Sequence, residues 1–248
     1  MPSVESLKMS ADQPKPLAYD AYQDLAEHYA AHIETKPHNA YYDRPAMVEM
    51  WPELEGRRVL DAGCGPGIYT QLLLERRAVV TAIDMSDRML ELARRRLGAD
   101  VDLRQVDMSL PLDMFESGDF SFVNAPLCLD YIEDWRQVFA EFGRILQPGG
   151  LVQFSCGHPS FDAEYYHTTQ YFSVEQVECT WKGFGKNVVM PSYRRSFQDL
   201  FTPLIENGFQ ITKVVEPLPT DDFKRADPKR YLSLMQRPAF ICIQATRV

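Results

Sequence analysis

The stretch VLDAGCGPG, residues 59–67, decides the fold. It completes a short apolar segment, residues 58–61, which we predict to be a β-strand. The strand enters a turn in which Gly63, Gly65 and Gly67 alternate with other residues. Glycine permits positive φ and lets a ligand approach the backbone, and open α/β sheets bind ligands at the carboxyl ends of their strands. The stretch therefore predicts a ligand-binding turn at the edge of a sheet.

Segments with the patterns of strands and helices alternate on both sides of this turn. Helical stripes lie between most of the apolar, β-branched segments. Such alternation implies parallel strands joined by crossover helices, which is a Rossmann-like, doubly wound α/β sheet. The predicted strands are residues 58–61, 78–83, 101–106, 120–125, 151–156, 209–215 and 239–246.

Three further segments complete the organisation of the chain. Residues 1–16 are polar and proline-rich, which predicts a flexible N-terminus ahead of one domain at 17–248. Polar residues and prolines at 35–45 predict an interruption between a first helix and a second, short one. Residues 157–195 are rich in aromatic side chains and too long for an ordinary loop. We expect this insert to be a lid or a small subdomain.

The charge balance bears on the partners of the protein. The 248 residues contain 26 Lys and Arg against 35 Asp and Glu, a formal charge of −9. Nucleic acids and anionic membranes are bound mainly by Lys and Arg, so this balance argues against both. No run approaches the ~18 apolar residues of a transmembrane helix, and the first residues lack the apolar core of a secretory signal. We expect a small-molecule partner.

The cysteines and histidines indicate neither a disulfide framework nor a metal site. The five cysteines are widely spaced, without a CxxC pair, which fits reduced thiols in the cytoplasm. His28 and His32 have the spacing of a zinc pair but lack the HExxH pattern and an obvious third ligand. We predict a cytoplasmic protein that binds no metal.

Carboxylates close the first three predicted strands. Asp84 lies 17 residues past Gly67, where it can accept hydrogen bonds from both hydroxyls of a ribose. Asp107 can accept from an adenine amino group while the adjacent Met108 covers the ring. Asp61 can meet a ligand cation directly or through water. Together they predict a nucleoside-binding edge.

Four segments carry a resemblance to a known family: residues 59–67, AIDMSDRMLELAR at 82–94, QVDM at 105–108 and GRILQPGGLV at 143–152. With them the chain resembles class I S-adenosylmethionine (SAM)-dependent methyltransferases, of the small-molecule branch that includes the ubiquinone-biosynthesis type. The resemblance implies a seven-stranded, mostly parallel sheet with an antiparallel last strand and helices on both faces. It also implies methylation of a small molecule with release of S-adenosylhomocysteine (SAH).

The resemblance assigns roles to individual residues. Asp84 would hold the ribose and Asp107 the adenine amino group, while the turn that begins at Asn124 would lie beside the transferable methyl. The hydroxyls of Tyr22 and Tyr29, on one face of the first predicted helix, would reach the methionine carboxylate, unless both rings are plain core. The expected cofactor-binding residues are Tyr22, Tyr29, Asp61, Gly63, Gly65, Gly67, Asp84, Met85, Asp107, Met108 and Asn124.

The turn at residues 124–127 bears on the acceptor. Methyltransferases that act on amino groups of nucleobases or glutamine amides often carry Asn/Asp-Pro-Pro-aromatic there, whereas this chain has Asn-Ala-Pro-Leu. Together with the negative charge, this departure favours a small molecule.

Four residues of the insert are candidates for contact with the acceptor. His158 follows the fifth strand, where it can act as a base or bind substrate, or simply bond to backbone. Tyr165 and Tyr166 either touch the substrate or pack within the lid. Arg195 can pair with a substrate carboxylate, although a solvated arginine is the alternative.

Two other classes remain open at this stage. A nicotinamide or flavin site requires G-x-G-x-x-G, which from Gly63 places a glycine at position 68, where Ile68 stands. The observed spacing favours SAM over an NAD(P)-dependent oxidoreductase. A non-catalytic binding module is also compatible, because the motifs predict cofactor binding rather than turnover.

Overall fold

A computed structural model describes residues 15–248, so the predicted flexible terminus lies almost entirely outside the described residues. All seven predicted strands form one sheet in the order β3-β2-β1-β4-β5-β9-β8, and β9 runs antiparallel to both of its neighbours. The predicted topology is confirmed. The strands are β1 (Arg58–Ala62), β2 (Val79–Asp84), β3 (Asp102–Gln105), β4 (Phe120–Pro126), β5 (Leu146–Gly157), β8 (Phe209–Val215) and β9 (Phe240–Arg247).

Helices cover both faces of the sheet because its strands are apolar on both sides. Leu60, Val123 and Phe154 face one core, under α5 (Trp135–Ile145) and α7 (Phe197–Glu206). Alternate strand residues such as Val59 and Phe122 face the opposite core. That core is covered by α3 (Ile68–Glu75) and α4 (Asp87–Leu97), and α2 (Arg44–Glu49) packs farther along the same sheet.

The ends of α4 follow directly from its sequence. The hydroxyl of Ser86 accepts a hydrogen bond from the Met89 amide at 3.1 Å, which caps the first turn. Arg94, Arg95 and Arg96 occupy the last turn, where positive charge opposes the helix dipole. Gly98 follows with φ +90°, a conformation that glycine adopts without strain.

The predicted interruption at residues 35–45 is present but shorter than expected, because helical structure resumes at residue 37. After α1 (Tyr19–His32) the chain forms a π-helical turn, η1 (Asn39–Asp43), which continues directly into α2. Pro45 has no amide hydrogen to offer to the carbonyl of Tyr41, four residues earlier. That carbonyl instead accepts from the amide and the hydroxyl of Thr220, each at 3.0 Å. A distant segment thus replaces the bond that proline removes.

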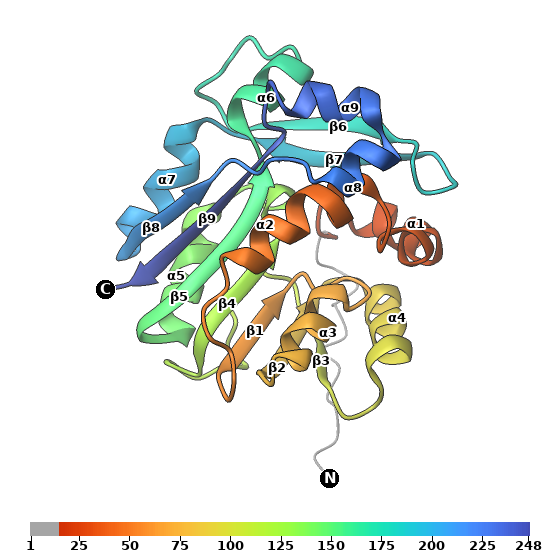
Figure 1. Cartoon of the computed structure of the whole chain (residues 1–248). Helices are drawn as coiled ribbons and strands as arrows, with labels where there is room; N and C mark the ends of the chain where they lie inside the picture. Colours follow the sequence, from red (N-terminus) through yellow and green to blue (C-terminus); the bar gives the residue numbers. More distant parts are fainter. Residues whose placement is uncertain (1–14) are drawn as a thin grey trace.

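The aromatic insert contains its own secondary structure. It comprises α6 (Pro159–Tyr165) and the antiparallel strands β6 (Glu175–Trp181) and β7 (Val188–Arg194), which form a separate two-stranded sheet. Phe184, between these strands, stacks on Tyr29 of α1 with ring centroids 4.9 Å apart. Figure 1 shows β6, β7 and α1 at the end of the main sheet where its parallel strands terminate.

Two shorter connections also contain helices. The segment at residues 216–238 holds α8 (Asp221–Ala226) and α9 (Pro228–Leu234), and Phe223 of α8 packs with Leu234 of α9 in a buried cluster. A 3-10 turn, η2 (Leu129–Tyr131), follows β4. Within residues 15–248, every helix lacks the length or the apolar character that crossing a membrane requires.

Candidate functional site

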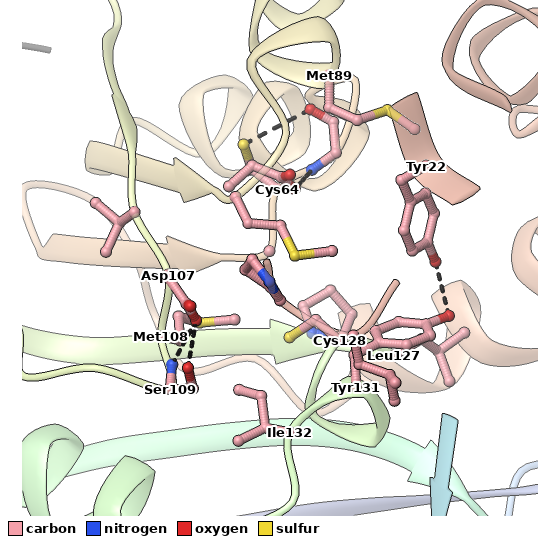
Figure 2. A pocket seen from close by; sticks show the side chains of 18 of the residues that line it. Tyr22, Cys64, Met89, Asp107, Met108, Ser109, Leu127, Cys128, Tyr131 and Ile132 are labelled. Atoms are coloured by element: carbon pink, nitrogen blue, oxygen red, sulfur yellow. Dashed lines mark hydrogen bonds between the residues drawn. The ribbon is translucent and has the colours of Figure 1, made fainter. Parts of the chain in front are cut away.

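A cavity of about 580 Å³ lies at the carboxyl ends of β1, β2 and β4. The glycine turn forms its floor, and α1 and η1 close it from above. Figure 2 shows Asp107 and Met108 on one side of the cavity and Tyr22 and Tyr131 on another. Of the expected cofactor-binding residues, those that line the cavity are Tyr22, Tyr29, Gly63, Gly65, Asp84, Met85, Asp107 and Met108.

The three glycines of the turn are needed for different reasons. Gly63 has φ +70°, and a Cβ there would lie 2.4 Å from the Cβ of Cys128, so no side chain fits. Gly65 has φ +53° but open space around it, so only the backbone conformation demands glycine. Gly67 has φ +84° and faces Leu97 of α4 rather than the cavity. It allows α3 and α4 to approach closely.

Asp84 ties the glycine turn to the start of α4. Its Oδ2 accepts from the Gly65 amide at 2.8 Å, and its Oδ1 accepts from the Ser86 amide at 2.9 Å. Burial raises the pKa of Asp84 to about 6. Each carboxylate oxygen can accept more than one hydrogen bond, so Asp84 retains capacity toward the cavity that it lines.

Asp107 and its apolar neighbours form one wall. The Asp107 Oδ1 accepts from the amide and the hydroxyl of Ser109, at 2.8 and 2.7 Å (Figure 2). Met85 and Met108 line the cavity with it. A planar, polar-edged group fits such a wall, because sulfur-bearing side chains pack well against rings.

Asp61 and Asn124, both expected among the cofactor-binding residues, are fully buried and lie outside the cavity lining. Asp61 is fully buried and accepts from the Thr70 hydroxyl at 2.6 Å and from the Asn124 amide at 2.9 Å. Asn124 in turn accepts from the indole of Trp51 at 3.1 Å. Burial raises the pKa of Asp61 to about 6. This network holds the ends of β1 and β4 together beneath the site.

Tyr22 and Tyr29 project into the cavity from α1. The Tyr22 hydroxyl lies 2.7 Å from that of Tyr131, and the two rings meet edge to face (Figure 2). Burial raises the pKa of Tyr22 and of Tyr131 well above the usual value, so both phenols are neutral. They can donate and accept hydrogen bonds but carry no charge.

His158 lies outside the cavity lining. Its Nδ1 accepts from the Ser160 amide at 3.3 Å, which caps α6, and its Nε2 lies 2.9 Å from the carboxylate of Glu216. The ring packs edge to face against Phe197. Both ring nitrogens are therefore engaged away from the site, which matches the structural alternative for this residue.

The three proposed substrate contacts also lie away from the cavity. Tyr165 is 52% exposed and stacks on Phe161. Tyr166 packs edge to face against Tyr165. Arg195 is 4% exposed, places its guanidinium 3.9 Å from the Trp135 ring centroid and donates to the Ile132 carbonyl at 2.8 Å. Arg195 is thus a core residue rather than a solvated one.

Two groups of lining residues were not anticipated. One follows the expected turn at residues 124–127, of which Pro126 and Leu127 line the cavity, and includes Cys128, Tyr131, Ile132 and Glu133. The other comes from η1, α2 and α3 and comprises Asn39, Asp43, Arg44 and Tyr69. Neither shows a motif. The sequence offered one indication of the second group, the adjacent opposite charges Asp43 and Arg44 before Pro45. They lie in the segment at residues 35–45 that was interpreted as an interruption between helices.

The strand order, the antiparallel β9 and a cavity between a glycine turn and two strand-end carboxylates define the class I SAM-dependent methyltransferase fold. Residues 59–150 match a methyltransferase domain family. A putative SAM-dependent methyltransferase from Listeria monocytogenes superposes with a TM-score of 0.72 and 26% identity, over 83% of this chain and 96% of that one. The cofactor that this class implies is SAM.

Two curated O-methyltransferases are similar to part of the chain in sequence. A malonyl-[acyl-carrier protein] O-methyltransferase from Enterobacter lignolyticus is 33% identical over 135 residues, 54% of this chain and 51% of that protein. A ubiquinone biosynthesis O-methyltransferase from Bordetella avium is 34% identical over 110 residues, 43% of this chain and 45% of that protein. The chain therefore spans about half the length of these relatives.

Proposed function

We propose that the protein transfers the methyl group of SAM to a small-molecule acceptor and releases SAH. The observation that carries the proposal is one cavity that combines a glycine turn, two carboxylates at strand ends and a tyrosine-lined roof. The residues present fit the cofactor. Gly63 and Gly65 leave room along the floor, Asp84 can accept from ribose hydroxyls, and Asp107 can accept from an adenine amino group.

Methyl transfer from SAM requires little acid–base catalysis by the protein. SAM, when bound, supplies a methyl group already activated by its sulfonium. The chain has to orient the acceptor and exclude water, and orientation alone can contribute ~7–11 kcal/mol. We infer that Tyr22, Tyr29 and Tyr131 do both, since α1 covers the cavity and their neutral hydroxyls can position a polar acceptor. We propose that His158 supports α6 and takes no part in the reaction.

The net charge of the chain and the side chains that line the cavity indicate the class of acceptor. A formal charge of −9 and a roof of aromatic rings favour a small, partly apolar molecule over a nucleic acid. The relatives with similar sequences are named O-methyltransferases, so oxygen nucleophiles are the first to test. All five cysteines are unpaired, which fits the reducing cytoplasm as the place of action. We infer that residues 157–195 serve as the lid over this single domain.

A thermal-shift titration with SAM, SAH, NAD and NADP tests the cofactor. A ligand at ~100 times its Kd stabilises by about 2.7 kcal/mol, which such a titration resolves. We expect SAM and SAH to raise the Tm and the dinucleotides to leave it unchanged. Stabilisation by a dinucleotide alone would contradict the proposal. SAH release measured against a panel of phenols, carboxylic acids and amines would then identify the acceptor.

A further inference from the structure

The loop between β6 and β7 reaches α1, the helix that covers the cavity (Figure 1). This hairpin loop, residues 182–187, carries Phe184 near its centre. Phe184 is 4% exposed, although Gly183 and Gly185 on either side of it are exposed. A buried phenylalanine between exposed glycines indicates that another part of the chain receives its ring. That part is α1 and the residues that follow it.

Two aromatic rings and one cation pack around Phe184. Its ring stacks on Tyr29 of α1, with centroids 4.9 Å apart, and on Trp181 of β6 at 5.6 Å. The ammonium of Lys36 lies 4.8 Å from the centroid of the same ring, in a place that a side chain at Gly183 would occupy. Tyr29 also lines the cavity. The hairpin loop and the cavity therefore share one residue of α1.

An ion pair also joins the hairpin loop to α1. The Lys186 ammonium pairs with the Asp24 carboxylate, and both side chains are exposed to solvent. Exposed ion pairs each contribute little to stability and weaken as salt increases. The contact between the loop and α1 therefore has a buried aromatic part and an exposed electrostatic part, which can be changed separately.

The hairpin depends on α1 for its own stability. Within residues 15–248, β6 and β7 pair only with each other, and an isolated two-stranded sheet is at best marginally stable in water. Phe184, Val188 and Met190 instead share one buried cluster with Leu25 of α1. Separation of the hairpin loop from α1 would expose apolar surface on both elements, so each holds the other in place.

We propose that Phe184 is a positioning residue, which holds α1 closed over the cavity by packing against Tyr29, and that a ligand exchanges when the hairpin loop leaves α1. Phe184 itself lies outside the cavity lining, so it acts through Tyr29. The inference rests on the proposed function and extends it, because it names the contact that governs how fast SAM enters and SAH leaves.

Surface plasmon resonance with SAH over the immobilised protein tests this role. Phe184→Ala removes the buried ring and should raise the dissociation rate of SAH by about tenfold, because loss of an interaction in a bound, closed state acts mainly on dissociation. Phe184→Leu keeps an apolar side chain and should recover part of that change. Phe172→Ala is the matched control. Phe172 belongs to the same insert but is 81% exposed, so its loss should leave the rate unchanged.

The ion pair provides a test that leaves the core intact. Asp24→Asn should raise the dissociation rate by about twofold at low salt, and high salt should remove the difference from the parent. Glu206→Gln, which removes an exposed charge of α7 paired with Arg136 of α5, should leave both the rate and its salt dependence unchanged.

Proteolysis gives an independent readout of the same loop. Lys182 and Lys186 are trypsin sites on either side of Phe184. A loop tip is cleaved most readily when it is detached from its surroundings. SAH should therefore slow cleavage at these two sites in the parent and much less in Phe184→Ala.

The possible outcomes separate the two proposals. If SAH binds the parent and leaves Phe184→Ala and Asp24→Asn at the parental rate, the positioning role is refuted and the cofactor assignment stands. An equal increase in Phe172→Ala would refute it too, since any aromatic residue of the insert would then serve. If Phe184→Ala does not fold, Asp24→Asn and its salt dependence decide the question. If the parent binds no SAH, the proposed function itself fails.

Discussion

The hydroxyl of Tyr22 on α1 lies 2.7 Å from the hydroxyl of Tyr131 on η2, and both belong to the cavity. The two residues are separated by 109 positions in the sequence. Tyr131 lies in η2, which directly follows strand β4 of the sheet. Tyr22 belongs to α1, the helix that covers the cavity. This hydrogen bond therefore joins the helix that covers the cavity to the turn that follows β4.

Removing either hydroxyl should loosen the roof. Tyr22→Phe and Tyr131→Phe each remove the hydrogen bond between two half-buried phenols, which should lower the free energy of unfolding by about 0.5–1.5 kcal/mol. The double variant should cost little more than one single variant, because both remove the same bond. Urea denaturation of the three variants measures this coupling. Strictly additive losses would show that the hydroxyls act independently.

Gly63 and Gly65 should differ in their tolerance of a methyl group. Gly63→Ala drives a Cβ to 2.4 Å from the Cβ of Cys128, in addition to the strain of φ +70°. Gly65→Ala carries only the backbone strain, since nothing lies within 4 Å. We expect Gly63→Ala to be less stable than Gly65→Ala by about 1–3 kcal/mol in urea denaturation.

A second substitution checks the cause. Cys128→Gly removes the atom that collides, so it should restore part of the stability of Gly63→Ala but none of that of Gly65→Ala. Equal stabilities of the two alanine variants would show that the close approach of Gly63 to Cys128 does not add to the cost of a methyl group at Gly63.

SAH binding should strengthen as the pH rises through 6. Burial raises the pKa of Asp84 to about 6, and ribose hydroxyls donate best to the ionised carboxylate. Protonation at lower pH therefore competes with the ligand, and affinity should increase between pH 5 and pH 7. Titration calorimetry across this range should show a pH dependence that Asp84→Asn, with weaker binding throughout, largely loses. An unchanged dependence in that variant would assign the titration to another group.

In the unliganded protein, the contribution of Asp84 to the free energy of unfolding should fall as the pH rises, which is opposite to the trend of SAH affinity. The pKa of Asp84 is higher in the folded than in the unfolded state, where it lies near 3.9, so the native state holds the proton more tightly. Its contribution to stability is fully present below pH 3.9 and is lost as the pH rises toward 6. Asp84→Asn should flatten this component of the pH profile of unfolding. A profile identical to that of the parent would contradict the assignment.

His158 should matter for stability and not for binding. His158→Ala removes the cap of α6 and should cost about 1 kcal/mol, whereas His158→Asn keeps a capping acceptor and should recover much of that loss. Both variants should bind SAH like the parent, because the ring lies outside the cavity. Once an acceptor is known, a 100-fold loss of kcat in His158→Asn at parental stability would return His158 to the reaction.

Local patterns in the chain were sufficient to predict the sheet and half of the site. The strands and the turn at residues 59–67 depend on short-range features, namely alternation, β-branching and glycine spacing. Asp84 and Asp107 were located because parallel strands bring their carboxyl ends to one edge, whatever the details of packing. The family resemblance strengthened these assignments but did not alter their basis.

Long-range contacts decided the remainder. Asp43 and Arg44 reach the cavity because Thr220, far along the chain, stabilises the π-turn that Pro45 would otherwise disrupt. Asp61 lies outside the cavity lining because it is fully buried between β1 and α3, where Thr70 and Asn124 donate to its oxygens. Local periodicity was enough to predict the alternating α/β sheet and the carboxylates at one edge of it, whereas the antiparallel last strand was expected from the family resemblance alone. Only the tertiary structure decided which polar side chains face the cavity, because that depends on partners distant in the chain.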